Sequence, residues 1–239
     1  MKERKQVYTS FHELPPREYM YFPKGTLEQG RPGKFSRMEI KHLLIAMGML
    51  TLAFSFTFSP IYNFQATKLV LALPISFLGI LTAFVVHELS HKFMAQKYGL
   101  WSEFRMFTNG LLLSLFFALF TGFVFAAPGA VMFRGETRIF ETGRIAAAGP
   151  GANILMAALT FGLSFFFFET TIGTVNMGLI AIFISFINSL LATFNLLPFG
   201  PMDGAKVIRW NGIVWAILFM SAITILALNL QRGIAFPSA

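Results

Sequence analysis

The sequence contains no cysteine, and only 13% of its 239 residues are charged. The absence of cysteine excludes disulfide bonds and thiolate metal sites. A soluble globular domain has about 25% charged residues, so this composition, with 55% hydrophobic residues, cannot cover a water-facing surface. It excludes an ordinary soluble enzyme and also a disordered chain, which needs the opposite composition. The composition indicates a membrane protein that crosses the bilayer several times.

The net charge is +8, which on its own could suggest a nucleic-acid partner. The Lys and Arg residues lie between apolar runs rather than along one face, however, so we expect no binding to nucleic acid. The expected surroundings are the lipid bilayer and the helices of other membrane proteins.

The chain divides into a polar part and an apolar part. Residues 1–41 are polar and contain Pro15-Pro16, which predicts a tail or a small cap on the membrane surface. Residues 42–239 form the predicted membrane-embedded domain, whose functional core covers about 69–209. Six apolar runs lie in this domain, at residues 43–59, 69–86, 111–133, 145–168, 176–197 and 213–230. Each is long enough to cross a hydrocarbon core of about 30 Å as a helix.

The distribution of basic residues favours one topology of these runs. If all six cross the membrane, the loop with Arg134, Arg138 and Arg144 lies outside, against the positive-inside rule. If residues 111–133 dip in and return on the same side, only Lys68 and Arg232 of the 19 basic residues lie outside. We therefore predict an all-α polytopic membrane protein with five transmembrane helices and one re-entrant segment. The alternative for 111–133 is a kinked spanning helix. The protein is expected in the cell membrane, with its N-terminus towards the cytosol.

The second apolar run ends in a metal-binding pattern. His87-Glu88-Leu89-Ser90-His91 places two imidazoles one helical turn apart on the same face, where both can bind one metal ion. Glu88 lies beside them and is suited to hold and deprotonate a metal-bound water. The alternative is a pair of polar residues at a helix end. Ionisable residues in a membrane span are costly, which favours the metal site. A second partial match, His12-Glu13, lacks the second histidine.

A zinc site of this kind needs a third protein ligand and an open position for water. Asp203 is the one aspartate of the sequence, in a stretch rich in proline and glycine directly after the fifth run. In the re-entrant topology the second and fifth runs both end on the cytosolic side, so Asp203 and the two histidines lie at the same depth. With six crossings Asp203 would lie on the opposite side, roughly 30 Å away. The alternative is an aspartate in an ordinary turn.

Small and amide residues complete the polar pattern. Ala148-Gly149-Pro150-Gly151 opens the fourth run, where small residues let helices approach closely. Asn153 in this run, and Asn188 and Asn195 on one face of the fifth, are expected to bind a ligand or substrate backbone, or to form interhelical hydrogen bonds.

With these motifs the chain resembles the site-2 proteases, a family of intramembrane zinc metalloproteases. The resemblance covers about 69–209 and rests on three motifs in order: His87-Glu88-Leu89-Ser90-His91, Ala148-Gly149-Pro150 with Asn153, and Asn195-Leu196-Leu197-Pro198 through Asp203-Gly204. It implies a three-helix catalytic core and one Zn²⁺ per chain, bound by His87, His91 and Asp203. It also implies Glu88 as general base, with Asn195 binding substrate or stabilising the oxyanion. We expect a minimal member, without a PDZ or CBS domain.

The expected activity is hydrolysis of peptide bonds in or near transmembrane segments of membrane-protein substrates, with the active site towards the cytosol. Two other classes fit the same polar site. One is a metal-ion transporter that uses His87, His91 and Asp203 as a transit site, and the other is a non-catalytic protein that binds membrane helices. Glu88 discriminates the protease from the transporter, because transport can continue without a general base and hydrolysis cannot.

Overall fold

The structure is a computed structural model that describes residues 35–59, 61–122, 124, 128–135, 137–172 and 175–232. Five helical segments within these ranges are long and apolar enough to cross a membrane, which confirms the predicted polytopic helical class. They are α1 (Arg37–Phe58), the continuous segment Ala66–Lys97, α5 (Ile139–Phe166), α6 (Met177–Asn195) and α8 (Gly212–Gln231). Helix α1 begins before its apolar run because Ser36 caps it, accepting a hydrogen bond from the Glu39 N–H at 3.1 Å.

The second membrane segment is not a uniform α-helix. It consists of α2 (Ala66–Ile80), a π-helical turn η3 (Leu81–Val85) and α3 (Val86–Lys97). The π-turn lies directly before His87, and turns of this kind inside helices are frequent at functional sites. The apolar sequence of this run predicts a helix but carries no signal for the turn.

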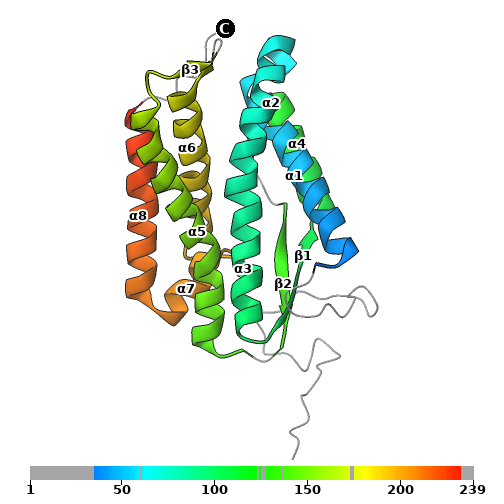
Figure 1. Cartoon of the computed structure of the whole chain (residues 1–239). Helices are drawn as coiled ribbons and strands as arrows, with labels where there is room; N and C mark the ends of the chain where they lie inside the picture. The colour runs from blue at the N-terminus through cyan, green and yellow to red at the C-terminus, as the bar shows by residue number, and fades with distance from the viewer. Residues whose placement is uncertain are drawn as a thin grey trace, which may run out of the picture.

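The third apolar run does not cross as one helix. Helix α4 (Thr108–Thr121) has 14 residues, or about 21 Å, which is less than the roughly 30 Å of a hydrocarbon core. It ends at Gly122, which adopts a left-handed conformation with φ 70°. The chain then returns beside its own starting point (Figure 1), in agreement with the predicted re-entrant excursion.

The two arms of this excursion are strands, which the sequence did not predict. Strand β1 (Trp101–Met106) precedes α4 and strand β2 (Gly129–Arg134) follows it, and the two pair antiparallel from Trp101↔Arg134 to Met106↔Gly129. A short apolar run can form a buried strand or part of a buried helix, and periodicity alone does not separate the two. The β1–β2 hairpin brings both flanks of the excursion to the same end of the molecule.

The remaining elements are arranged on the two sides of the α2–α3 segment. Figure 1 shows α5, α6 and α8 on one side, with α1, α4 and the β1–β2 hairpin on the other and the α2–α3 segment between them. Helix α5 packs against α3, α6 and α8 and against the short helix α7 (Asp203–Trp210). The connections hold a 3-10 turn, η2 (Ile61–Asn63), and a second small hairpin, β3 (Thr171–Ile172) with β4 (Val175–Asn176). The residues of the three motifs lie in α3, α5, α6 and α7 and in the connection between α6 and α7.

Candidate metal centre

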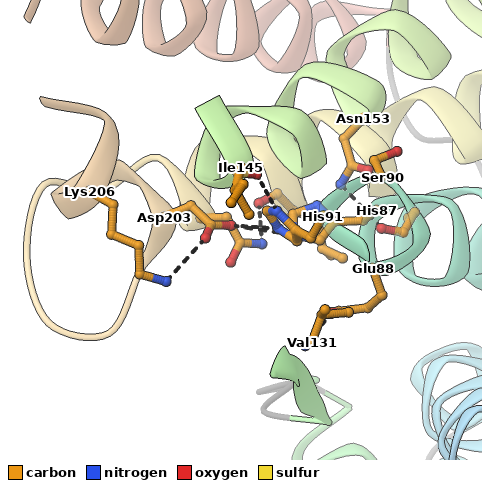
Figure 2. Close-up of polar contacts among 12 residues, drawn as sticks. His87, Glu88, Ser90, His91, Val131, Ile145, Asn153, Asp203 and Lys206 are labelled. Atoms are coloured by element: carbon orange, nitrogen blue, oxygen red, sulfur yellow. Dashed lines mark hydrogen bonds and ion pairs between the residues drawn. The ribbon is translucent and has the colours of Figure 1, made fainter. Parts of the chain in front are cut away.

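Three potential metal ligands from two distant segments converge inside the bundle (Figure 2). His87 and His91 lie one turn apart on α3, and their Nε2 atoms are 3.0 Å apart. Asp203 is the first residue of α7, and its Oδ2 lies 3.5 Å from Nε2 of His87 and 3.1 Å from Nε2 of His91. Donors around a tetrahedral ion with bonds of about 2.1 Å lie about 3.4 Å apart, so the observed spacing fits one ion. All three residues are buried.

The backbone of α5 fixes the orientation of one imidazole. Nδ1 of His91 lies 2.7 Å from the carbonyl oxygen of Ile145. A carbonyl only accepts, so Nδ1 carries the proton and donates it, which leaves Nε2 free to bind a metal. Metal-binding histidines are usually held in this way by the ring nitrogen that does not contact the metal.

Gly149 provides the space in which the imidazoles lie. A Cβ atom on this residue would lie 2.3 Å from Nε2 of His91 and 2.7 Å from Nε2 of His87. The sequence predicts that small residues here serve helix packing, and the structure gives Gly149 the additional role of admitting the two rings. Gly151, two positions further on in α5, has no atom within 4 Å of the corresponding point.

Replacing Gly149 by alanine is therefore expected to weaken metal binding. Alanine in a helix interior is normally more favourable than glycine by about 1 kcal/mol, but at this position its methyl group displaces both Nε2 atoms. We expect zinc affinity to fall about tenfold or more, as measured by competition with a chromophoric chelator. Gly151→Ala is the matched control and should bind zinc as the wild type does; equal affinity in both variants would contradict the close approach.

A tight connection after α6 delivers Asp203 to the histidines. Gly200 adopts φ 65°, and a Cβ on Gly204 would lie 2.1 Å from the carbonyl oxygen of Leu196, so α7 begins in contact with the end of α6. Lys206, one turn along α7, lies 3.6 Å from Oδ1 of Asp203 and leaves Oδ2 for the histidines. Burial acts to raise the pKa of the Asp203 carboxyl, but the adjacent imidazoles of His91 and His87 and the ammonium of Lys206 hold it well below its usual range. The ligand is therefore a carboxylate.

Glu88 leaves α3 on the side of β2 and does not join the three ligands (Figure 2). Its Oε2 accepts a hydrogen bond from the backbone N–H of Val131 at 3.0 Å, and the side chain is buried. This carboxylate is beside the ligands in sequence and lies outside the group of three that converge, which is the placement that a general base needs.

The three asparagines lie in different surroundings. Asn153 donates to the carbonyl of Ala83 at 3.2 Å, and Asn188 donates to the hydroxyl of Thr82 at 2.9 Å. Both therefore brace the π-turn before His87 by interhelical hydrogen bonds, one of the two expectations for them. Asn195 donates to Leu191 in its own helix at 3.0 Å, and its catalytic role stays a prediction.

Two residues at the site, Lys206 and Val131, are not expected there from the sequence. The spacing of three residues between Asp203 and Lys206 on a helix was an available signal. The contact of Glu88 with Val131 depends on the β1–β2 hairpin, and nothing in the sequence indicates it.

Comparison with known proteins gives this site a family. A protein of Methanocaldococcus jannaschii named "Putative zinc metalloprotease MJ0611" is 39% identical over 186 residues, which cover 77% of this chain and 91% of that protein. The chain belongs to the same zinc metalloprotease family. The assignment to the site-2 proteases, made from the three motifs, agrees with this result.

A second member of the zinc metalloprotease family is more distant. The protein of Bacillus subtilis named "Putative zinc metalloprotease YwhC" is 28% identical over 154 residues, which cover 57% of this chain and 68% of that protein. No family model and no solved structure matches the chain. The donor set found here, two imidazoles and one carboxylate, is of the N/O type that catalytic zinc sites use.

Proposed function

We propose that the protein is an intramembrane zinc protease that hydrolyses peptide bonds in or near the transmembrane segments of other membrane proteins. The observation that carries the proposal is the convergence of His87, His91 and Asp203 inside an apolar bundle. His87 lies ten residues before the end of its helix at Lys97, or about 15 Å along the axis. Two of the three ligands, His87 and His91, thus belong to a membrane-spanning segment, and Asp203 meets them from the short helix α7.

Each side chain of the centre has a distinct role in this proposal. His87, His91 and Asp203 would hold the zinc, which would supply a Lewis acid that lowers the pKa of water towards 7 and polarises a carbonyl. Glu88 accepts the proton of the attacking water and later delivers it to the leaving amine. Asn195, at the end of α6, is proposed to bind the substrate backbone or the developing oxyanion.

In the part of the chain that the structure describes, no strand pairs with the outer edge of β2, and this open edge supports an extended substrate. The N–H of Phe107 donates to the carbonyl of Pro128 at 2.9 Å. Because backbone hydrogen bonds join alternate pairs of an antiparallel ladder, the odd-numbered residues of β1 are hydrogen-bonded to the even-numbered residues of β2. Val131 therefore turns its N–H to the other edge, where it meets Glu88. An unwound substrate could add to this edge as a further strand. Helix-breaking residues near the scissile bond should help, because a helical amide is hydrogen-bonded and hidden.

We place the end of the bundle that carries the β1–β2 hairpin and α7 in the cytosol. Introduced cysteines test this orientation cleanly because the chain has none of its own. Cysteines at the exposed positions Lys97 and Arg134 should react with an impermeant reagent from the same side, and those at Tyr62 and Glu169 from the opposite side. Labelling of Lys97→Cys and Arg134→Cys from opposite sides would overturn the re-entrant topology.

The proposal is tested by mapping where the protein cuts. Purified protein in nanodiscs is incubated with a single-span substrate, and the intact masses of the products locate the bond. We expect cleavage in or beside the apolar segment, and faster cleavage when Gly-Pro is placed there. The control substrate keeps the same flanks around an all-leucine span. Cuts confined to the soluble flanks of both substrates would contradict intramembrane action.

A further inference from the structure

A fully buried ion pair lies one residue beyond the metal ligand His91. The ammonium of Lys92 on α3 is 2.5 Å from Oε2 of Glu39 on α1, and both side chains are 0% exposed. Charged residues are rarely buried unless paired. Ion pairs are also a weak source of stability, because apolar side chains of similar volume often serve as well or better. The Glu39–Lys92 pair therefore calls for an explanation other than stability.

The same two side chains hold the backbone of β1. Oε1 of Glu39 accepts the N–H of Phe104 at 3.0 Å, and Nζ of Lys92 donates to the carbonyl of Ser102 at 3.2 Å. The hydroxyl of Ser102 donates in return to the carbonyl of Lys92 at 3.2 Å. Three elements, α1, α3 and β1, thus meet in one buried polar network.

This network and the proposed general base bind the two residues of one cross-strand pair, from opposite edges of the hairpin. Phe104 is bound by Glu39 on the outer edge of β1, and its cross-strand partner is Val131. Val131 in turn donates to Glu88 from the open edge of β2. Because this cross-strand pair connects Glu39 to Glu88, a shift of β1 away from α1 moves the open edge of β2 relative to α3 and its metal ligands.

We propose that Glu39 and Lys92 are positioning residues, which hold the hairpin so that an extended substrate on the open edge of β2 lies in register with the metal centre. This inference rests on the proposed proteolytic function and adds the residues that set substrate register. Neither residue touches the substrate. Their effect is transmitted by the hydrogen bonds to Ser102 and Phe104.

The main test replaces both charges at once. The double variant Glu39→Leu/Lys92→Met keeps the volume and leaves no lone buried charge, so it should fold. It should retain one zinc per chain and raise the KM for a single-span substrate about tenfold or more, with kcat within about threefold. Arg232→Met is the control; it removes an exposed cation that follows α8, on the side of the bundle opposite the hairpin (Figure 1), and donates to Ser164 at 3.0 Å, so the KM should not change.

The variant Glu39→Asp provides a second test if the double variant does not fold. It keeps both charges paired but shortens the carboxylate, so that β1 must shift to keep its bond from Phe104. We expect KM to rise about threefold or more with full zinc content. An unchanged KM in the folded variant, or loss of zinc together with kcat at constant KM, would overturn the positioning role. Failure of the zinc-loaded wild type to cleave the substrate at all would refute the proposed function itself.

Discussion

Replacing Glu88 by glutamine is expected to lower the rate of cleavage by about 10²- to 10⁴-fold, the usual contribution of a general acid–base group. Glutamine keeps the shape of the side chain, and its carbonyl oxygen can still accept the hydrogen bond from Val131. It cannot take a proton from water. Because Glu88 is not one of the three converging ligands, zinc should remain bound at one ion per chain.

The measurement combines kcat for a single-span substrate with zinc content by mass spectrometry. Glu169→Gln, at an exposed position remote from the centre, is the matched control and should behave as the wild type does. Undiminished cleavage by Glu88→Gln would remove Glu88 as the base. Zinc uptake into vesicles that continues in this variant would favour the transporter class, which needs the ligands but no base.

The second large effect is expected for Asp203→Asn. A carboxylate contributes a charged oxygen to the ion, whereas the amide of asparagine is neutral. Loss of an outer partner of a ligand already weakens metal binding about 10- to 100-fold, so we expect zinc affinity to fall about 100-fold or more. Cleavage at low zinc should fall in parallel and recover partly when zinc is added.

Two further variants separate coordination from charge in this experiment. Lys206→Met removes the cation at 3.6 Å from Oδ1 of Asp203 but leaves the ligand, so it should weaken zinc binding far less. Glu88→Gln should lose activity without a loss of affinity. If Asp203→Asn binds zinc as tightly as the wild type, the third ligand has been assigned wrongly.

The sequence was sufficient to predict the convergence of the three candidate ligands and the five long apolar helices, because local spacing and charge carry both. Two histidines four residues apart on a helix must share a face. The basic residues around 111–133 could be reconciled with the positive-inside rule only if the chain returned. That topology also placed Asp203 at the depth of the histidines, and the structure brings the three together.

Features that depend on tertiary contacts could not be predicted. An apolar run shows the same hydrophobic pattern whether it forms a helix such as α4, a strand or a π-turn. Gly149 looked like one small residue among several, because the imidazoles beside it come from another helix. Glu39 and Lys92 lie in separate helices at the edge of apolar runs, so their pairing appears only once α1 and α3 are packed.

Zinc titration of the metal-free protein tests the central claim most directly. The protein is stripped with a chelator in nanodiscs, and cleavage of the single-span substrate is measured as zinc is added in fractions of one ion per chain. We expect no cleavage without metal, then a linear rise and a sharp plateau at one zinc per chain. Full cleavage by the metal-free protein, or none at one bound zinc, would contradict that claim.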